Sequence, residues 1–206
     1  HHATAHPASP ESPASPMSLL HLSLLPGLAC DQALFEPQLP ALAGLPGLGA
    51  PQVSDVHTRA ASLPEMARLF LAERPGPQVL VGCSMGGMLA LEIWRQAPQA
   101  VRALALLGST ARPDTPELIA LRSQACELFA QGRVDEVLRA NVMVAFHPLS
   151  RSRPGLMDAY LAMVHRAGAG QLIRQNRAVM ARVDSRPDLP HVRCPGARAC
   201  ASSTPG

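Results

Sequence analysis

The sequence predicts an α/β protein in which a parallel sheet is flanked by helices and carries an additional group of helices. Three observations support this. In the first half of the chain, short apolar runs of strand character alternate with helical patterns, which is typical of a parallel sheet covered on both faces. After residue 107 the strand pattern stops, and helical patterns continue to about residue 182. Finally, 206 residues with 47% hydrophobic content suffice for one core.

The charge pattern says little about binding partners, but it does not favour a protein that binds nucleic acid. The chain contains no lysine, so all 18 basic residues are arginines, and they are scattered along the sequence with a net charge of +3. A protein that binds nucleic acid through electrostatics usually concentrates its basic residues. We therefore expect no nucleic-acid partner.

The first residues predict neither an export signal nor a membrane anchor. Residues 1–16 contain Pro, Ser, Ala and His without long apolar side chains, so we expect a disordered tail, and Met17 is a plausible start. Residues 17–30 resemble a lipoprotein signal, but no Lys or Arg precedes the apolar segment, which is interrupted by His21 and Ser23. No apolar run is long enough to span a membrane. Five cysteines without a CxxC pair indicate free thiols, so a cytoplasmic location is expected.

The strands and helices of the first half follow in order. A buried strand is expected over residues 19–25, and a second over residues 52–57. A capping box at Ser62 and Glu65 then opens an amphipathic helix that ends before Pro75. Two further strands, at residues 79–81 and 101–107, complete a set of about four.

The stretch from residue 78 to residue 92 is the most informative part of the sequence. An apolar strand runs into Gly-Cys-Ser-Met-Gly-Gly, and a helical pattern follows at once. Ser84 in such a turn needs a strained backbone, and only Gly82 and Gly86 leave room for it. The N–H of Met85 then lies at a helix N-terminus, where it can face a developing oxyanion. This pattern resembles the nucleophile elbow of the α/β-hydrolase superfamily. The alternative is a glycine-rich turn that only packs.

The resemblance implies roles for other residues. In the superfamily, the loop after the first strand supplies a second oxyanion donor, which here corresponds to the N–H of Leu28; otherwise this loop is only a connection. Asp31 in the same loop is expected to be a helix cap, and Cys83 a packing residue. The family needs no metal or organic cofactor, and the expected partner is a small-molecule ester or other acyl substrate.

The helical stretch at about residues 112–182 is similar to the cap of the superfamily, within an α/β-hydrolase domain spanning residues 17–195. Methionines in this cap could line an acyl pocket or belong to its core. Arg174 and Arg177 are expected on a solvated helix face. Asp114 occupies a capping position at the start of the first cap helix, although some family members keep their catalytic acid near this position.

The sequence departs from the family after the cap. Residues 196–206, GARACASSTPG, have no apolar run and no Asp, Glu or His, so we expect an irregular tail in place of the last strands. The change reads like a truncation or frame shift near Pro195, and it should leave the strand at residues 101–107 as an unpaired edge. The remaining histidines are expected to be surface or packing residues: His57, His147, His165 and His191.

The expected function is therefore a serine hydrolase acting through an acyl-Ser84 intermediate, similar to small bacterial esterases and lactonases. Its catalysis should be impaired, because a serine hydroxyl needs a nearby base and a group that orients this base. Two alternatives remain open. One is a non-catalytic remnant or binding module, and the other is an acyltransferase or cofactor-free haloperoxidase on the same scaffold.

Overall fold

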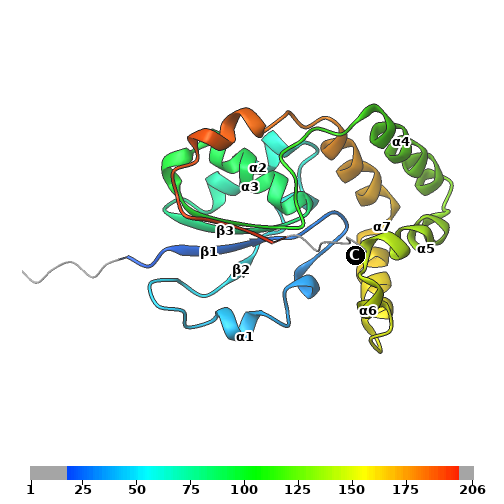
Figure 1. Ribbon diagram of the computed structural model, residues 1–206, viewed down its shortest axis with the longest axis horizontal. Helices are drawn as coiled ribbons and strands as arrows, with labels where there is room; N and C mark the ends of the chain where they lie inside the picture. The colour runs from blue at the N-terminus through cyan, green and yellow to red at the C-terminus, as the bar shows by residue number, and fades with distance from the viewer. Residues whose placement is uncertain (1–17, 200–206) are drawn as a thin grey trace, which may run out of the picture.

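The computed structural model describes residues 18–199, and its centre is a five-stranded parallel sheet in the order β2-β1-β3-β4-β5 (Figure 1). The strands are β1 (His21–Leu25), β2 (Gln52–Val53), β3 (Gln78–Cys83), β4 (Val101–Leu107) and β5 (Gly196–Ala199). The α/β class with a parallel sheet flanked by helices is confirmed. The tail expected at residues 1–16 lies outside the described part of the chain.

Helices lie on both faces of the sheet (Figure 1). On one face, α2 (Leu63–Glu73) and α3 (Met85–Gln96) bury Phe70, Leu89 and Ile93 in the main core. The other face is covered by η1 (Gln32–Leu34) and α1 (Leu39–Leu42), next to a smaller core. Such two-sided burial explains why β1 reads as a continuous apolar run rather than an alternating one.

Short 3₁₀ helices connect several elements: η2 (Val56–Thr58), η3 (Pro98–Ala100) and η4 (Arg186–His191). The strand predicted over residues 52–57 is therefore shorter than expected. It ends at Val53 because the next residues form local hydrogen bonds: the hydroxyl of Ser54 accepts from the N–H of Val56, and the C=O of Asp55 accepts from the N–H of Thr58. Such local bonding competes with pairing in a sheet.

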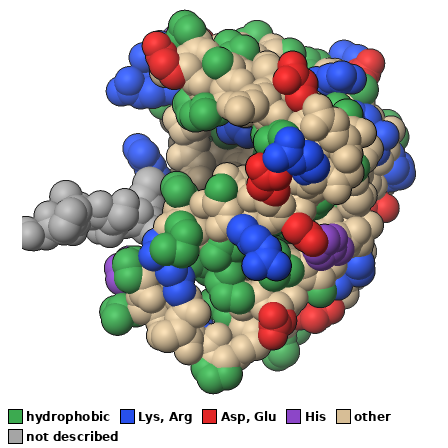
Figure 2. Space-filling view, turned by 90° about the vertical axis from the view of Figure 1, so that its right-hand side faces the viewer, with side chains coloured by type: hydrophobic (Ala, Val, Ile, Leu, Met, Phe, Trp, Pro, Cys, Tyr) green, Lys and Arg blue, Asp and Glu red, His purple; other side chains and the backbone are tan. Residues whose placement is uncertain are grey.

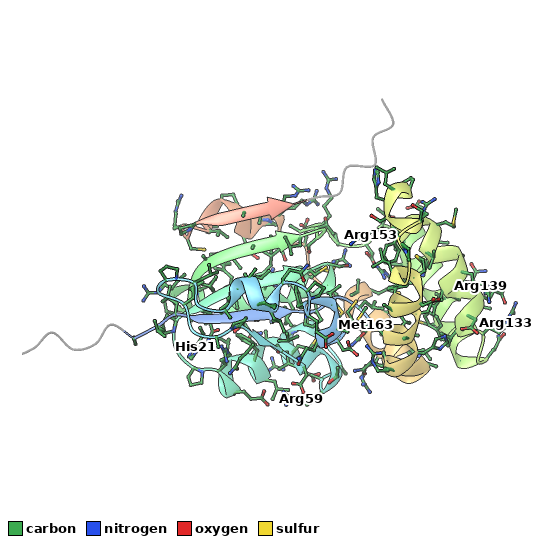
Figure 3. All side chains as sticks on the ribbon, turned by 90° about the horizontal axis from the view of Figure 1, so that it is seen from below. His21, Arg59, Arg133, Arg139, Arg153 and Met163 are labelled. Carbon is green, nitrogen blue, oxygen red and sulfur yellow. The ribbon has the colours of Figure 1, made fainter. Side chains whose placement is uncertain are left out.

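The cap comprises α4 (Pro116–Ala130), α5 (Val134–Ala145), α6 (Pro148–Arg151) and α7 (Leu156–Met180). It lies beyond the carboxyl ends of the strands (Figures 1 and 3). Helix α7 has a kink at Gly168, where φ is 78° and ψ is 166°, so it consists of two helical halves. The inner half reaches the sheet, because Ala178 and Val179 belong to the main core.

Strand β5 corrects the expectation of an irregular tail for residues 196–199; residues 200–206 are not described. It pairs in parallel with β4 from Leu104 to Leu107, so this half of β4 is not the unpaired edge expected from sequence. The sequence Gly-Ala-Arg-Ala lacks large apolar residues, but pairing needs only backbone groups. The N–H of Leu104 donates to the C=O of Pro195 over 3.1 Å, and β5 continues from there.

Arginine and acidic side chains of the described residues are intermixed across the cap side of the molecule (Figure 2). On the outer surface of the cap, Arg133 and Arg139 point away from the sheet (Figure 3). Between residues 18 and 199, none of the helices has the length and apolar character needed to cross a membrane.

Candidate active site

Ser84 lies at the sharp turn between β3 and α3, at the edge of the sheet that faces the cap. Its backbone has φ of 52° and ψ of −114°, which L-residues with a side chain rarely adopt. Such a conformation costs on the order of 1–3 kcal/mol, so the surrounding contacts must enforce it. The side chain is exposed, and its hydroxyl makes no hydrogen bond to any described residue. The oxygen is therefore free to meet a ligand.

Two glycines make this turn possible. A Cβ on Gly82 would lie 2.4 Å from the C=O oxygen of Gly86, and a Cβ on Gly86 would lie 1.9 Å from the C=O oxygen of Leu25. Real Cβ atoms do not approach oxygen so closely, so no other residue fits either position without a backbone shift. These distances are consistent with the glycines expected two positions before and after Ser84, whose role in an elbow stays a prediction. The contact with Leu25 also brings the end of β1 against the turn.

The loop after β1 lies directly beside Ser84. A Cβ on Gly27 would be 3.4 Å from the Cβ of Ser84, and a turn closes where the N–H of Cys30 donates to the C=O of Gly27 over 3.0 Å. Within residues 18–199, the backbone N–H groups of Leu28 and Met85 donate no hydrogen bond to protein. Two free donors thus flank the Ser84 turn, and one of them opens a helix.

A buried amide fixes this loop from the cap. Gln175 of α7 is fully buried; its Oε1 accepts from the N–H of Ala29 over 2.7 Å, and its Nε2 donates to the C=O of His57 over 3.0 Å. Ala29 has φ of 60°, a left-handed conformation that favours glycine. Sequence analysis did not single out Gln175; the available signal is a glutamine among the apolar positions Leu172 and Val179 of the inner face of α7.

His57 completes the same network. Its Nε2 lies 2.7 Å from the C=O oxygen of Cys30, and because a carbonyl only accepts, Nε2 carries the proton. Burial lowers the pKa of His57, and its Nδ1 has no partner among the described residues. His57 is therefore a neutral packing residue, as expected from sequence.

A family model described as alpha/beta hydrolase fold matches residues 37–142, just over half of the chain. The chain belongs to the α/β-hydrolase fold family. The match includes β3, the Ser84 turn and α3, where the sequence resemblance is most specific.

Solved structures of α/β hydrolases and related enzymes have the same fold. An esterase from Thermogutta terrifontis is 24% identical, with a TM-score of 0.72, and the alignment covers 87% of this chain and 70% of that one. An enol-lactonase from Burkholderia xenovorans is 17% identical, with a TM-score of 0.70 and coverage of 88% and 72%. A hydrolase from Pseudomonas aeruginosa is 19% identical, with a TM-score of 0.71 and coverage of 89% and 72%. A comparison with curated protein sequences gives no match.

The other histidines of this α/β hydrolase have different surroundings. His165 pairs with Asp135 on the cap surface over 2.9 Å, and His147 accepts from the N–H of Leu149 at the start of α6. His191 is exposed at the end of η4. His21 lies at the amino end of β1, the end remote from the cap (Figure 3). None of these four side chains hydrogen-bonds to Ser84 in the described chain.

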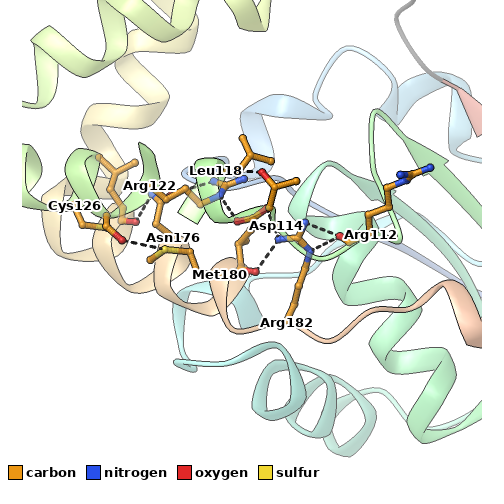
Figure 4. A network of polar contacts seen from close by, with 12 residues as sticks. Arg112, Asp114, Leu118, Arg122, Cys126, Asn176, Met180 and Arg182 are labelled. Carbon is orange, nitrogen blue, oxygen red and sulfur yellow. Dashed lines mark hydrogen bonds and ion pairs between the residues drawn. The ribbon is translucent and has the colours of Figure 1, made fainter. Parts of the chain in front are cut away.

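Asp114 is not the helix cap that the sequence predicts. The cap of α4 is Thr115, whose hydroxyl accepts from the N–H of Leu118. The carboxylate of Asp114 is 1% exposed and lies between Arg122, at 2.7 Å, and Arg182, at 2.9 Å (Figure 4). These ion pairs join the segment before the first cap helix, α4, to the segment after the last one, α7. A carboxylate held by two arginines is a structural anion, so it is not free to orient a catalytic base.

Asp31 caps η1, as expected, since its Oδ1 accepts from the N–H of Ala33 over 2.9 Å. It also pairs with Arg166 of the cap, and this contact holds the pKa of Asp31 below its usual range. Arg174 and Arg177 are exposed, which confirms their expected place on a solvated face of α7.

The two thiols near Ser84 do not resemble nucleophiles. Burial raises the pKa of Cys30 to about 12, with a smaller effect of Cys83, and burial also raises the pKa of Cys83. Because the thiolate is the reactive form of cysteine, both groups are inert at neutral pH. Cys83 packs against the smaller core, as the sequence suggested. Among the described cysteines, Cys126 and Cys194 are also free.

One cavity of about 140 Å³ lies along α3 below the Ser84 turn. It is lined by Met88 and Glu92 of α3, by Thr110 after β4 and by Arg182 after α7. Its volume is smaller than the 300–1,000 Å³ typical of small-molecule sites, so it holds only a small group. In the described chain, no three His, Cys, Asp or Glu residues are grouped in a way that could hold a metal ion.

Proposed function

We propose that this α/β hydrolase is a serine hydrolase of carboxylic esters or related acyl compounds, with Ser84 as its nucleophile. The observation that carries the proposal is the strained, exposed Ser84 turn with free N–H groups on both sides. The esterase and lactonase activities named for the similar structures support the same substrate class. The free thiols support a cytoplasmic setting.

In the proposed reaction, the Ser84 oxygen bonds to the acyl carbon, and the carbonyl electron pair moves onto oxygen. The N–H groups of Leu28 and Met85 stabilise this oxyanion, which matters because such preorganised donors are worth about 3–4 kcal/mol each. The C–O bond to the alcohol then breaks, and the alcohol leaves with a proton taken from solvent. In the second half, water adds to acyl-Ser84, which releases the carboxylic acid and regenerates the Ser84 hydroxyl. The proton of Ser84 passes to solvent, because no described histidine bonds to its hydroxyl.

A fluorophosphonate probe tests the nucleophile, because it phosphonylates an activated serine. Incubation of the purified chain for hours, followed by mass spectrometry of peptides, should find slow modification at Ser84. Ser123→Ala is a matched control, since Ser123 is exposed on α4. Modification should survive in Ser123→Ala and disappear in Ser84→Ala; a chain that is labelled equally well in Ser84→Ala would refute the assignment.

The second candidate is a non-catalytic binding module. It is favoured by one observation: no described histidine bonds to the Ser84 hydroxyl, while Asp114 lies between two arginines and His57 is bonded to Cys30. Ester turnover that disappears in Ser84→Ala would exclude this candidate.

A further inference from the structure

Three segments that are far apart in sequence contact one another: the loop after β1, η2 and the inner half of α7. They are joined by the Gln175 amide and by the His57 ring, which bond to the backbone of Ala29 and Cys30. We infer that Gln175 is a positioning residue, which holds the N–H of Leu28 toward the Ser84 turn. This inference rests on the proposed function, because it concerns the donor assigned to the oxyanion.

The geometry of the loop leaves the Leu28 N–H little freedom. On one side, Gly27 lies so close to Ser84 that an added Cβ would be 3.4 Å from the Ser84 Cβ; on the other, the N–H of Ala29 is held by Gln175 over 2.7 Å. Peptide units are planar, and each residue has only two soft dihedrals. Fixing the Ala29 N–H therefore fixes the plane of the Leu28–Ala29 peptide, which adjoins the Gly27–Leu28 peptide that carries the Leu28 N–H. The hydrogen bond from the N–H of Cys30 to the C=O of Gly27 fixes the orientation of this second peptide.

An amide is suited to this position because it offers an acceptor and a donor in one planar group. Its oxygen meets the N–H of Ala29, and its nitrogen meets the C=O of His57. His57 in turn donates from Nε2 to the C=O of Cys30. The network thus starts at the loop, passes through α7 and η2, and returns to the loop. Every member is neutral, so the network adds no charge beside the oxyanion.

The positive φ of Ala29 shows why an external contact is needed. An alanine does not favour this conformation by itself, whereas a glycine would. The hydrophobic contacts agree, because Leu28 packs against both the main core and the cap core, and Ala29 is buried in the cap core. The cap therefore contributes to the Ser84 site through Gln175, although its helices begin after β4.

The test compares Gln175→Leu and Gln175→Glu with Asn176→Leu. Asn176 is a matched control: it is buried on the same helix, but it bonds only to Leu172 and Arg122 within the cap. Two readouts are needed. One is amide hydrogen exchange at Ala29 and Leu28 by NMR, and the other is the rate of fluorophosphonate modification at Ser84.

In Gln175→Leu, we expect lost protection of the Ala29 N–H and modification at least tenfold slower. Gln175→Glu keeps an acceptor for Ala29 and, because burial favours the protonated carboxyl, also a donor for the C=O of His57 without adding charge. It should retain protection and most of the rate, even if Gln175→Leu folds poorly. Asn176→Leu should stay within about twofold of the unmodified protein. An unchanged rate in Gln175→Leu would overturn the inference.

The two proposals can fail separately. If the unsubstituted chain is not modified at Ser84, the acyl-serine proposal fails, and exchange alone judges the loop contact. Equal protection of Ala29 in Gln175→Leu and in the unsubstituted chain would then show that Gln175 does not hold the loop. If the chain is modified and protection is lost without a rate change, the proposed function stands and the positioning role is wrong.

Discussion

The two halves of the candidate site differ in how they are built. The half that would bind the acyl oxygen consists of backbone, and close glycine contacts and Gln175 hold it in place. The half that would move protons needs side chains, and the buried acid Asp114 after β4 is paired with Arg122 and Arg182. Backbone donors are thus specified by local packing, whereas acid and base must be brought to the serine from other segments. In the described residues, free N–H groups flank the Ser84 turn, whereas no histidine bonds to the Ser84 hydroxyl.

The largest expected effect follows from the lack of a base beside Ser84 in the described part of the chain. Hydrolysis of p-nitrophenyl acetate by the 206-residue chain should be about 10⁶-fold slower than by an enzyme with a complete triad, which corresponds to about 8 kcal/mol. A residual acceleration of roughly 10³ over water should remain, since oxyanion donors act without the base. The measurement is steady-state turnover beside the Thermogutta terrifontis esterase. Turnover close to that esterase, abolished by Ser84→Ala, would show that a histidine reaches Ser84 after all.

The backbone half can be broken with one methyl group. Gly86→Ala should lower the free energy of unfolding by roughly 4 kcal/mol, because the new Cβ would overlap the C=O oxygen of Leu25. Gly132→Ala is the control: φ there is 76°, but a Cβ would meet nothing within 4 Å. It should cost only about 1 kcal/mol. Urea titrations of both variants give the two values, and equal losses would contradict the close approach.

The committed acid can be tested by removing its charge. Asp114→Asn should cost about 3 kcal/mol, because Arg182, whose side chain is 6% exposed, loses its carboxylate partner. Asp184→Asn removes a solvent-exposed partner of Arg186 and should leave the melting temperature unchanged. Thermal melts of the two variants decide between a structural and a free carboxylate. A stable Asp114→Asn protein would free Asp114 for another role.

The smallest expected effect concerns His57. Burial lowers the pKa of His57 below 6.5. Below pH 6.5, His57 is therefore protonated more readily in the unfolded chain than in the folded one. Stability is therefore complete above about pH 6.5 and falls as the pH drops toward the folded pKa, with a slope of at most about 1.4 kcal/mol per pH unit. His57→Gln should flatten this slope in urea titrations between pH 5 and 7. His191→Gln, at an exposed position, should not.

The sequence predicts the Ser84 turn well because its causes are local. Gly82, Ser84 and Gly86 lie within five residues. Ser84 has a positive φ, and the two glycines stand where a Cβ would overlap the backbone. The alternation of strands and helices is local in the same sense, and the cap boundaries follow from helical periodicity. These features therefore agree with the structure, apart from the short β2.

The parts that sequence reasoning missed depend on distant partners. Asp114 has the sequence context of a helix N-cap. Its carboxylate instead binds Arg182, which follows the last of the cap helices. Gln175 bonds to Ala29, which lies 146 residues earlier in the sequence, so nothing near Gln175 in sequence indicates its role. Strand β5 has no apolar pattern, because its pairing depends on the free edge of β4 rather than on its own side chains.

The kink at Gly168 has a consequence for how substrate preference can change. It divides α7 into an outer segment, packed with α5 and α6, and an inner segment that carries Gln175. Because the backbone of Gly168 is not helical, the two segments are separate helical runs with separate contacts: the inner one packs on the main core through Ala178 and Val179, and the outer one packs in the cap core through Val164. We expect substitutions on the outer segment to leave the contacts of Gln175 in place. The same glycine gives protein engineers a natural joint at which the outer cap can be swapped.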